Sequence, residues 1–196
     1  MSDFSASTDR SARRRKLREN AISDRQRQSV ATLAAWTSAL NQHLLAQWPA
    51  SPGSIIGFCW AVNNEPDMLP VLDHWRRTQP DSVVALPVVT GLARPLSFRT
   101  WHAGAAMVTD RYGIPTPAEG DFVQPEVLLI PLNAFDWQGY RIGYGGGFFD
   151  RTLASLRPRP LAIGVGFELG RVDNIWPEPH DERLDWIVTE AGCWKT

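Results

Sequence analysis

The stretch that most constrains this fold is a glycine-rich run at residues 141–153, which lies between an apolar segment and a helical pattern. Its four glycines, at positions 143, 145, 146 and 147, permit positive φ angles and let several backbone N–H groups point at one anion. Residues 127–131 predict a buried strand, and residues 148–156 predict a helix. A loop between a strand and a helix N-terminus brings free amides and the positive end of the helix dipole together. The sequence therefore predicts a phosphate-binding loop.

Two familiar nucleotide-binding motifs do not fit this loop. The Walker motif requires Lys and then Ser or Thr after the last glycine, whereas Phe148 follows Gly147 here. A dinucleotide fingerprint that began at Gly143 would require another glycine at position 148, and no acidic residue ends a strand about twenty residues later. A tight structural turn is the alternative to a phosphate site. Arg141 and Arg151 flank the loop, and their charges favour the phosphate site.

Asp150 stands in the first turn of the predicted helix, beside the loop. A carboxylate repels a phosphate unless a cation lies between them, so Asp150 suggests a Mg²⁺ ion that bridges to phosphate oxygens. A simpler interpretation is that the acid stabilises the helix N-terminus, an effect of about 0.3–1 kcal/mol. The two interpretations are compatible.

Further motifs surround the glycines: Ala-Phe-Asp at 134–136, Gly-Tyr-Arg at 139–141 and Phe-Phe-Asp-Arg at 148–151. With these motifs the run at residues 132–153 resembles the 5-formyltetrahydrofolate cyclo-ligase family, also called methenyltetrahydrofolate synthetase. The resemblance extends to residues 54–67, 95–101 and 161–190. It implies an enzyme that uses ATP and Mg²⁺ to close 5-formyltetrahydrofolate to 5,10-methenyltetrahydrofolate. The implied route phosphorylates the formyl oxygen and releases ADP and phosphate.

The resemblance also implies a role for individual residues. The implied catalytic residues are Arg141 and Tyr144, and the implied metal ligands are Asp150 and Asp181. The implied ATP-binding residues are Arg10, Arg14, Arg18, Arg141, Ile142, Gly143, Tyr144, Gly145, Gly146, Gly147, Phe148 and Phe149. The implied substrate-binding residues are Trp60, Glu65, Trp101, Tyr144, Gly145, Gly146, Gly147 and Phe148.

Some of these residues have simpler explanations. Glu65 precedes a Pro and an Asp, so it can be an acid at the start of a helix. Trp60 and Trp101 can be core aromatics, since the chain contains nine Trp. The sequence also departs from the family pattern at Thr116, where family members usually carry Glu. Any contact that this carboxylate makes is therefore absent or replaced.

The N-terminal region is strongly basic. Residues 1–27 contain eight Arg or Lys and four Asp or Glu, although the whole chain of 196 residues has a formal net charge of −1. Such a run can be a solvated helix face, a patch for nucleic acid or membrane, or a phosphate clamp. The resemblance favours the clamp. The family motif of Lys, two residues, an aliphatic residue and Arg fits in two registers, Arg14-Leu17-Arg18 or Arg10-Arg13-Arg14, and in both an Arg fork replaces the Lys.

Apolar and helical patterns alternate along the chain, which is typical of an α/β fold. The composition predicts a polar, disordered tail at residues 1–9 and a single domain at residues 10–196. We expect helices from Arg10, from a cap at Ser23 and from Glu65. The expected strands are residues 54–62, 83–89, 96–101, 127–131 and 161–167. These elements predict a three-layer sandwich with a largely parallel sheet, helices on both faces, and a ligand beyond the carboxyl ends of the strands.

Several function classes are disfavoured by composition. No apolar run approaches about 18 residues, and Cys59 and Cys193 match no metal-ligand spacing. We therefore expect a cytoplasmic monomer without a membrane or nucleic-acid partner. The alternative function is a noncatalytic nucleotide- or RNA-binding paralogue on the same fold. A sugar-phosphate isomerase or acyl-transfer enzyme would need a Glu or Lys base, which the glycine loop lacks.

Overall fold

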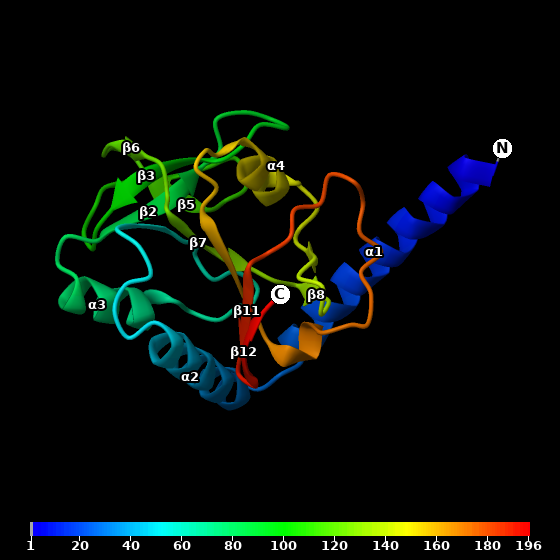
Figure 1. The fold of residues 1–196 in the computed structure, drawn as a ribbon, viewed down its shortest axis with the longest axis horizontal. Helices are drawn as coiled ribbons and strands as arrows, with labels where there is room; N and C mark the ends of the chain where they lie inside the picture. Colours follow the sequence, from blue (N-terminus) through cyan, green and yellow to red (C-terminus); the bar gives the residue numbers. More distant parts are fainter. Residues whose placement is uncertain (1) are drawn as a thin grey trace.

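The computed structural model describes the backbone of residues 2–196 and the side chains of residues 9–196. Its centre is an eight-stranded sheet with helices on both sides (Figure 1). The helices are α1 (Ser2–Gln26), α2 (Val30–Gln47), α3 (Leu69–Thr78), α4 (Phe148–Ser155) and the 3₁₀-helix η1 (Glu168–Gly170). The strands are β1 (Ile55–Gly57), β2 (Val83–Val88), β3 (Ser97–Trp101), β4 (Met107–Thr109), β5 (Pro115–Pro117), β6 (Phe122–Val123), β7 (Val127–Pro131), β8 (Ala134–Phe135), β9 (Arg141–Ile142), β10 (Leu161–Val165), β11 (Trp186–Thr189) and β12 (Gly192–Lys195).

The sheet is largely parallel, as the sequence predicts. Its strand order is β12-β11-β10-β7-β1-β2-β3-β6, and the strands from β11 to β2 run parallel. The chain goes from β1 to β2 in one direction and from β7 through β10 and β11 in the other, so the order reverses between β1 and β7. Ligands of open α/β sheets bind beyond the carboxyl ends of the strands at such a reversal. Both the loop after β1 and the segment after β7 leave the sheet at this place.

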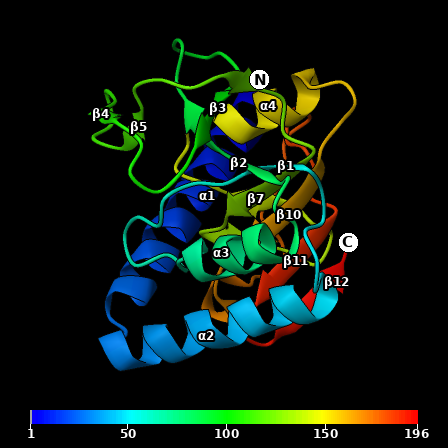
Figure 2. The same cartoon turned by 90° about the vertical axis from the view of Figure 1, so that its left-hand side faces the viewer.

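Helices α2 and α3 cover one face of the sheet, and α4 covers the other (Figure 1, Figure 2). On the first face Leu40 and Trp75 pack in one core cluster with Leu129. On the second face Leu153 of α4 packs with Leu128. Because both faces of β7 are covered, that strand is a continuous apolar run rather than an alternating one. The three-layer α/β prediction is confirmed.

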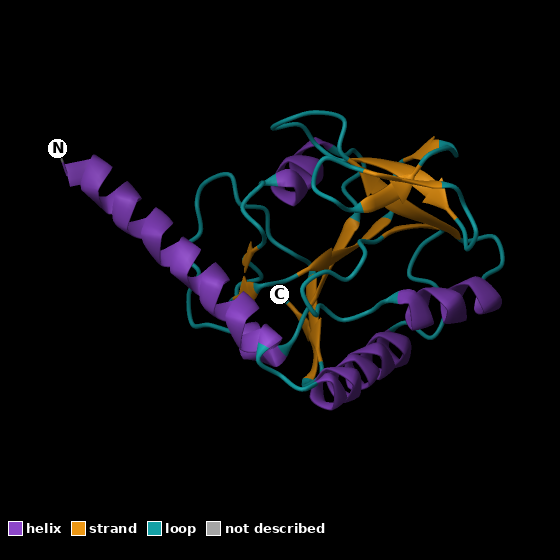
Figure 3. Cartoon of the chain, turned by 180° about the vertical axis from the view of Figure 1, so that it is seen from behind, coloured by secondary structure: helices purple, strands orange, loops and turns teal. Residues whose placement is uncertain are grey.

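Helix α1 extends away from the body, and its C-terminal half packs on the rest (Figure 3). Leu17 and Ala21 pack there against Ile142 of β9. Helix α1 begins at Ser2 rather than at Arg10, where the sequence predicts its start, and residues 2–26 contain no Gly or Pro to interrupt it. The disordered character expected for residues 1–9 stays a prediction. A division of the chain at residue 10 stays a prediction. Within the part of the chain that is described, none of the helices combines the length and the apolar character of a bilayer span.

The two other expected helix starts are also wrong. Ser29 rather than Ser23 caps α2, because the Ser29 hydroxyl accepts a backbone N–H of the first turn at 3.0 Å. Helix α3 begins at Leu69 rather than Glu65, and the Asp67 carboxylate accepts the Leu69 N–H at 3.0 Å. The acidic cluster therefore precedes the helix instead of forming its first turn.

Strand β1 ends at Gly57, not at residue 62 as expected. The chain then leaves the sheet and turns at Asn63 and Asn64. Their φ angles of 50° and 62° lie in the left-handed region, which Asn tolerates better than most residues. This turn sets the position of Glu65, the next residue.

Candidate active site

The glycine loop lies between the short β8–β9 hairpin and helix α4, as predicted. Gly145 has a φ of 94° and Gly147 a φ of 62°, so both need the freedom of glycine. Helix α4 begins at Phe148, and no side chain of the described residues caps it. The amides of its first turn can therefore bind an anion.

Two arginines contact the carbonyl groups of the loop. Arg18 of α1 donates from Nε to the Gly143 carbonyl at 2.7 Å, and Arg151 of α4 donates to the Gly146 carbonyl. Burial and, second, the neighbouring charge of Arg14 lower the pKa of Arg18 below its ordinary value. An anion beside Arg14 and Arg18 would offset the repulsion between their charges, so the arrangement favours phosphate binding.

Of the two possible registers of the family motif, Arg14, Leu17 and Arg18 lie on the side of α1 that contacts the rest of the protein. Leu17 packs against a hydrophobic cluster, whereas the side chain of Arg13 is 51% exposed and pairs with Asp9. Arg10 lies one turn before Arg14, and no hydrogen bond or ion pair joins it to the part of the chain that the structure describes. Arg14 and Arg18 thus contact residues of the site, whereas a role of Arg10 in ATP binding stays a prediction.

Arg141 and Asp150 form an ion pair beneath the loop. Arg141 is 6% exposed; its Nη2 lies 3.0 Å from Asp150 Oδ1, and its Nη1 donates to the Glu182 carbonyl at 2.8 Å. The Glu182 N–H donates to the same Asp150 oxygen at 3.1 Å. Burial lowers the pKa of Arg141, although the charges of Asp150, Asp181 and Glu182 oppose this effect. These acids therefore gather around one buried guanidinium.

Asp150 and Asp181 differ in how well they fit a Mg²⁺ ion. Asp150 is 18% exposed at its side chain, and its Oδ2 accepts no hydrogen bond from the described residues. Asp181 is 5% exposed, and both of its oxygens accept hydrogen bonds from Arg14. Among the residues that are described, no group of three or more His, Cys, Asp or Glu side chains is arranged to hold a metal ion. Mg²⁺ needs only one or two carboxylates when phosphates and water complete its shell, so Asp150 fits this ion as the structure stands.

Glu65 is buried beside the glycine loop, so it is not a helix-start acid. The Tyr144 hydroxyl donates to Glu65 Oε1 at 2.8 Å, and the Val62 N–H donates to Oε2 at 3.1 Å. Burial raises the pKa of Glu65, while the bonds from Val62 and Tyr144 and the charge of Arg25 act in the opposite direction. Burial and, second, the charge of Glu65 raise the pKa of Tyr144 to about 12, so its hydroxyl stays protonated at neutral pH. Tyr144 thus joins the loop to a buried carboxylate.

Arg25 is a site residue that the sequence analysis missed. It is 3% exposed, donates from Nε to the Asn63 carbonyl at 2.7 Å, and donates from Nη2 to the Tyr144 hydroxyl oxygen at 3.1 Å. In the sequence it is one of eight cations in a basic region. The available signal is its spacing, which places it two turns after Arg18 and three turns after Arg14 on one helix face.

Trp60 and Trp101 meet edge to face, with ring centroids 5.2 Å apart. Phe58 contacts both rings, and the three side chains pack against the core, so core packing accounts for part of their role. The Trp60 indole donates to the Pro115 carbonyl at 2.9 Å. Among the residues described, no hydrogen bond links either ring to Glu65. Contact of these rings with folate stays a prediction.

Thr116, the departure from the family pattern, is 6% exposed in strand β5. Its hydroxyl donates to the Pro87 carbonyl at 3.1 Å. The side chain therefore ends on the backbone of β2 and presents no charge. Four residues earlier, Tyr112 contacts Phe148 with ring centroids 5.8 Å apart, which brings this segment against the end of the glycine loop.

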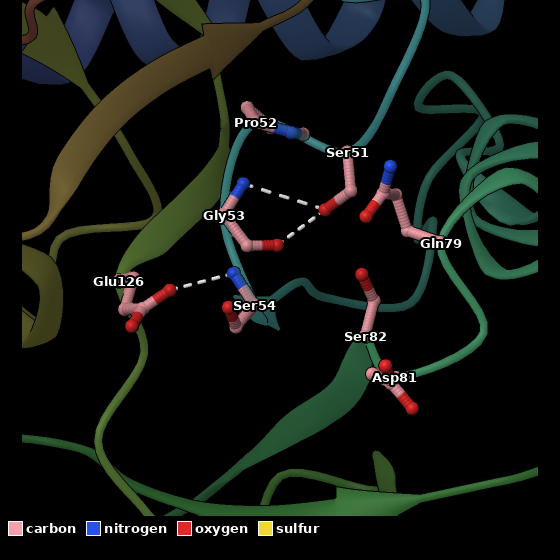
Figure 4. A pocket seen from close by; sticks show the side chains of 8 residues that line it. All are labelled: Ser51, Pro52, Gly53, Ser54, Gln79, Asp81, Ser82 and Glu126. Atoms are coloured by element: carbon pink, nitrogen blue, oxygen red, sulfur yellow. Dashed lines mark hydrogen bonds between the residues drawn. The ribbon is translucent and has the colours of Figure 1, made fainter.

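A separate pocket of about 210 Å³ lies at the amino ends of the parallel strands (Figure 4). Its lining residues precede β1, β2 and β7: Ser51, Pro52, Gly53, Ser54, Gln79, Asp81, Ser82 and Glu126. Glu126 lines one side of the pocket, and its carboxylate accepts a hydrogen bond from the Ser54 N–H at 2.6 Å. The glycine loop lies past the opposite ends of these strands, so this pocket is not part of the candidate active site.

Comparison with known proteins places the chain in one family. The model of the 5-formyltetrahydrofolate cyclo-ligase family matches residues 9–190. A 5-formyltetrahydrofolate cyclo-ligase of Escherichia coli K12 is 28% identical over 186 residues, which cover 91% of this chain and 97% of the relative. The cyclo-ligase of Mycolicibacterium smegmatis is 30% identical over 138 residues, which cover 65% of this chain and 69% of that protein.

Solved structures share the fold. The NMR structure of Aquifex aeolicus 5,10-methenyltetrahydrofolate synthetase superimposes with a TM-score of 0.76 at 24% identity, and covers 93% of this chain and 92% of its own. The structure of a 5,10-methenyltetrahydrofolate synthetase from Mycoplasma pneumoniae gives a TM-score of 0.74 at 22% identity, and the match covers 90% of this chain and 98% of that one. The fold, the glycine loop and the match over residues 9–190 agree, and the chain belongs to the 5-formyltetrahydrofolate cyclo-ligase family.

Proposed function

We propose that this protein catalyses the ATP- and Mg²⁺-dependent cyclisation of 5-formyltetrahydrofolate to 5,10-methenyltetrahydrofolate, with release of ADP and phosphate. The observation that carries the proposal is the hydrogen bond from Tyr144 to Glu65. It joins a loop suited to phosphates to a buried carboxylate suited to the N–H groups of a pterin. Membership of the cyclo-ligase family supports the same reaction.

The chemistry requires activation of an amide. The formyl oxygen is a weak nucleophile and the formyl carbon resists attack by the neighbouring amine. Transfer of the γ-phosphoryl group from ATP to that oxygen forms a new P–O bond and releases ADP. The second folate nitrogen then attacks the formyl carbon and loses its proton, the ring closes, and the C–O bond breaks to release phosphate, which can take up that proton. Such a transfer depends on positioning and charge neutralisation more than on a strong base.

The nucleotide side of the site is assigned to the loop and its arginines. The backbone amides of residues 143–147 would hold phosphate oxygens, and Arg14 and Arg18 would neutralise them from α1. Arg141 would stabilise charge on the transferred group. Ile142 and Phe149 flank the loop and complete its shape.

Asp150 would hold Mg²⁺, which when bound supplies positive charge to the phosphates. Both oxygens of Asp181 accept hydrogen bonds from Arg14. Asp181 would therefore be a second Mg²⁺ ligand beside Asp150 only if Arg14 releases it and binds the phosphates instead. The metal assignment of Asp181 therefore depends on an exchange of partners.

The folate side is assigned to Glu65, Tyr144 and the two Trp rings. Glu65 would accept hydrogen bonds from the pterin, while Tyr144, Trp60, Trp101 and Phe148 would offer flat surfaces. A ring pair contributes about 0.5–1.5 kcal/mol beyond area burial. The monomeric state, the cytoplasmic location and the lack of a nucleic-acid partner stay predictions.

The test is the absorbance rise of methenyltetrahydrofolate when purified protein is mixed with 5-formyltetrahydrofolate, ATP and Mg²⁺. We expect a rise that disappears when ATP or Mg²⁺ is left out. No rise in the complete mixture would reject the catalytic proposal. RNA binding that weakens steeply with salt would then favour the noncatalytic paralogue.

A further inference from the structure

A buried ion pair lies where α1 meets the glycine loop. Arg25 and Glu65 are both 3% exposed at their side chains, and their charged atoms are 3.8 Å apart. Removing one partner from a buried pair is strongly unfavourable, because the other charge is left uncompensated. Glu65 is therefore held in place by a residue of the N-terminal helix, 40 positions away in the sequence.

Tyr144 connects this pair to the loop. Its hydroxyl donates to Glu65 at 2.8 Å and accepts from Arg25 at 3.1 Å and from the Asn63 side chain at 3.3 Å. Its residue surface is nevertheless 45% exposed. The residue is thus fixed at its hydroxyl end while much of its surface stays open to solvent. Three segments, α1, the turn after β1 and the glycine loop, meet at this one oxygen.

The arrangement has a thermodynamic consequence for two ligands. Gly145 and Gly147 make the loop intrinsically adaptable, so binding phosphates to the loop must restrict its conformations. A loop restricted in this way keeps the Tyr144 hydroxyl hydrogen-bonded to Glu65, and Arg25 contacts both side chains. A second ligand that binds Glu65 then binds a carboxylate that is already positioned, so its affinity is higher. By thermodynamic linkage, the second ligand raises the affinity of the loop for phosphates by the same factor.

We propose that Arg25 is a positioning residue that holds Tyr144 on Glu65 and thereby couples nucleotide binding at the glycine loop to folate binding at Glu65. The inference rests on the proposed function, since it takes the two ligands from it. Arg25 touches neither ligand in this scheme and acts only through the two side chains it holds.

The test measures the dissociation constant of 5-formyltetrahydrofolate by calorimetry, with and without a saturating non-hydrolysable ATP analogue and Mg²⁺. We expect the analogue to tighten folate binding in the wild type by about fivefold or more. The ratio of the two constants should fall toward one in Arg25→Met and in Tyr144→Phe, and Arg25→Lys should lie between. Arg27→Met is the matched control, because Arg27 is also near the end of α1 but is 67% exposed and pairs only with Asp24 and Ser23 among the described residues.

The outcomes separate the inference from the function on which it rests. A wild type that binds both ligands with a ratio of one overturns the inference and leaves the proposed function standing. An Arg25→Met protein that keeps the wild-type ratio also overturns it. If Arg25→Met does not fold, Tyr144→Phe decides, because it removes only the hydroxyl and leaves the Arg25–Glu65 pair. A wild type that binds neither ligand overturns both proposals.

Discussion

Arg14 and Asp181 form a bidentate ion pair, with Nη1 to Oδ2 at 2.5 Å and Nη2 to Oδ1 at 3.0 Å. The pair joins the first helix to the segment before β11, across 167 residues of sequence. Its side chains are 14% and 5% exposed, so water screens it little. Nη1 of Arg14 also donates to the Trp176 carbonyl at 3.1 Å. Both terminal nitrogens of this guanidinium are therefore engaged with the protein itself.

The first prediction concerns which N-terminal arginines bind ATP. If the register Arg14-Leu17-Arg18 is the phosphate clamp, Arg14→Met and Arg18→Met should each raise the KM for ATP at least tenfold, or about 1.4 kcal/mol. Arg14→Met should also lower the free energy of unfolding by about 1–3 kcal/mol, since it leaves the Asp181 carboxylate without its charged partner. Steady-state kinetics and urea unfolding measure the two effects.

Arg15→Met provides the control, because Arg15 is exposed on the same helix and carries the same charge. Its KM for ATP and its unfolding midpoint should match those of the wild type. A large rise in KM from Arg10→Met with none from Arg18→Met would show that the other register is used.

The Asp150 carboxylate pairs with Arg141 and is proposed to hold Mg²⁺, and two variants can separate these roles. Asp150→Asn keeps the size of the side chain and one oxygen acceptor, but removes the charge that a Mg²⁺ ligand needs. We expect turnover to fall at least a hundredfold, or about 2.7 kcal/mol, with a weaker response to added Mg²⁺. Asp150→Ala should in addition lower the unfolding free energy, because Arg141 would lose its partner. The exposed Asp173 supplies the control Asp173→Asn, and a Mg²⁺ titration that Asp150→Asn leaves unchanged would reject the metal assignment.

Gly145 tests whether the loop binds phosphate or is only a turn. A Cβ atom added at Gly145 would lie 3.3 Å from Arg18 Nη2, so this guanidinium would have to shift, and the φ of 94° strains any residue that has a side chain. Gly145→Val should therefore weaken ATP binding at least tenfold, measured by calorimetry. Gly104→Val is matched for strain, since Gly104 has a φ of 89° but has no described atom within 4 Å of an added side chain. Equal ATP affinity in both variants would reduce the loop to a structural turn.

The local patterns predicted the centre of the molecule well. Residues 127–131 are a strand and α4 begins at Phe148, because an apolar run and a glycine stop are strong local signals. Helix starts were less predictable. Glu65, Pro66 and Asp67 have the composition of a first helical turn, but burial against Tyr144 competes for Glu65, and the helix begins only at Leu69.

The site itself was predictable only in part. The glycine pattern predicted the loop and singled out Asp150, and the resemblance added Glu65 and Asp181 as candidates. The partner of Glu65, in contrast, is an Arg on a helix far away in sequence. Helical spacing places Arg25 on the same face as Arg14 and Arg18, but it does not show that Arg25 is buried while Arg27 is exposed. Tertiary contact determines that difference, and a single sequence does not display it.

Glu65 should make the stability of the protein depend on pH. Burial raises its pKa above the ordinary value of 4.5, so the folded state binds this proton more tightly than the unfolded state. The contribution of Glu65 to the free energy of unfolding therefore falls as pH rises from 4.5 through the folded pKa. Glu65→Gln removes this term, so the stability of the variant relative to the wild type should increase with pH across that window.

Urea unfolding at several values between about pH 5 and pH 8 measures the difference, and other titrating groups cancel because both proteins share them. Glu119→Gln removes an exposed carboxylate as the control, and its stability should follow the wild-type curve. The effect on folate binding should be opposite to the gain in relative stability. Glu65→Gln should bind folate more weakly, because the amide replaces one acceptor oxygen with a donor. A relative stability that does not change with pH would contradict the burial of an ionisable Glu65, and unchanged folate affinity would remove it from the substrate site.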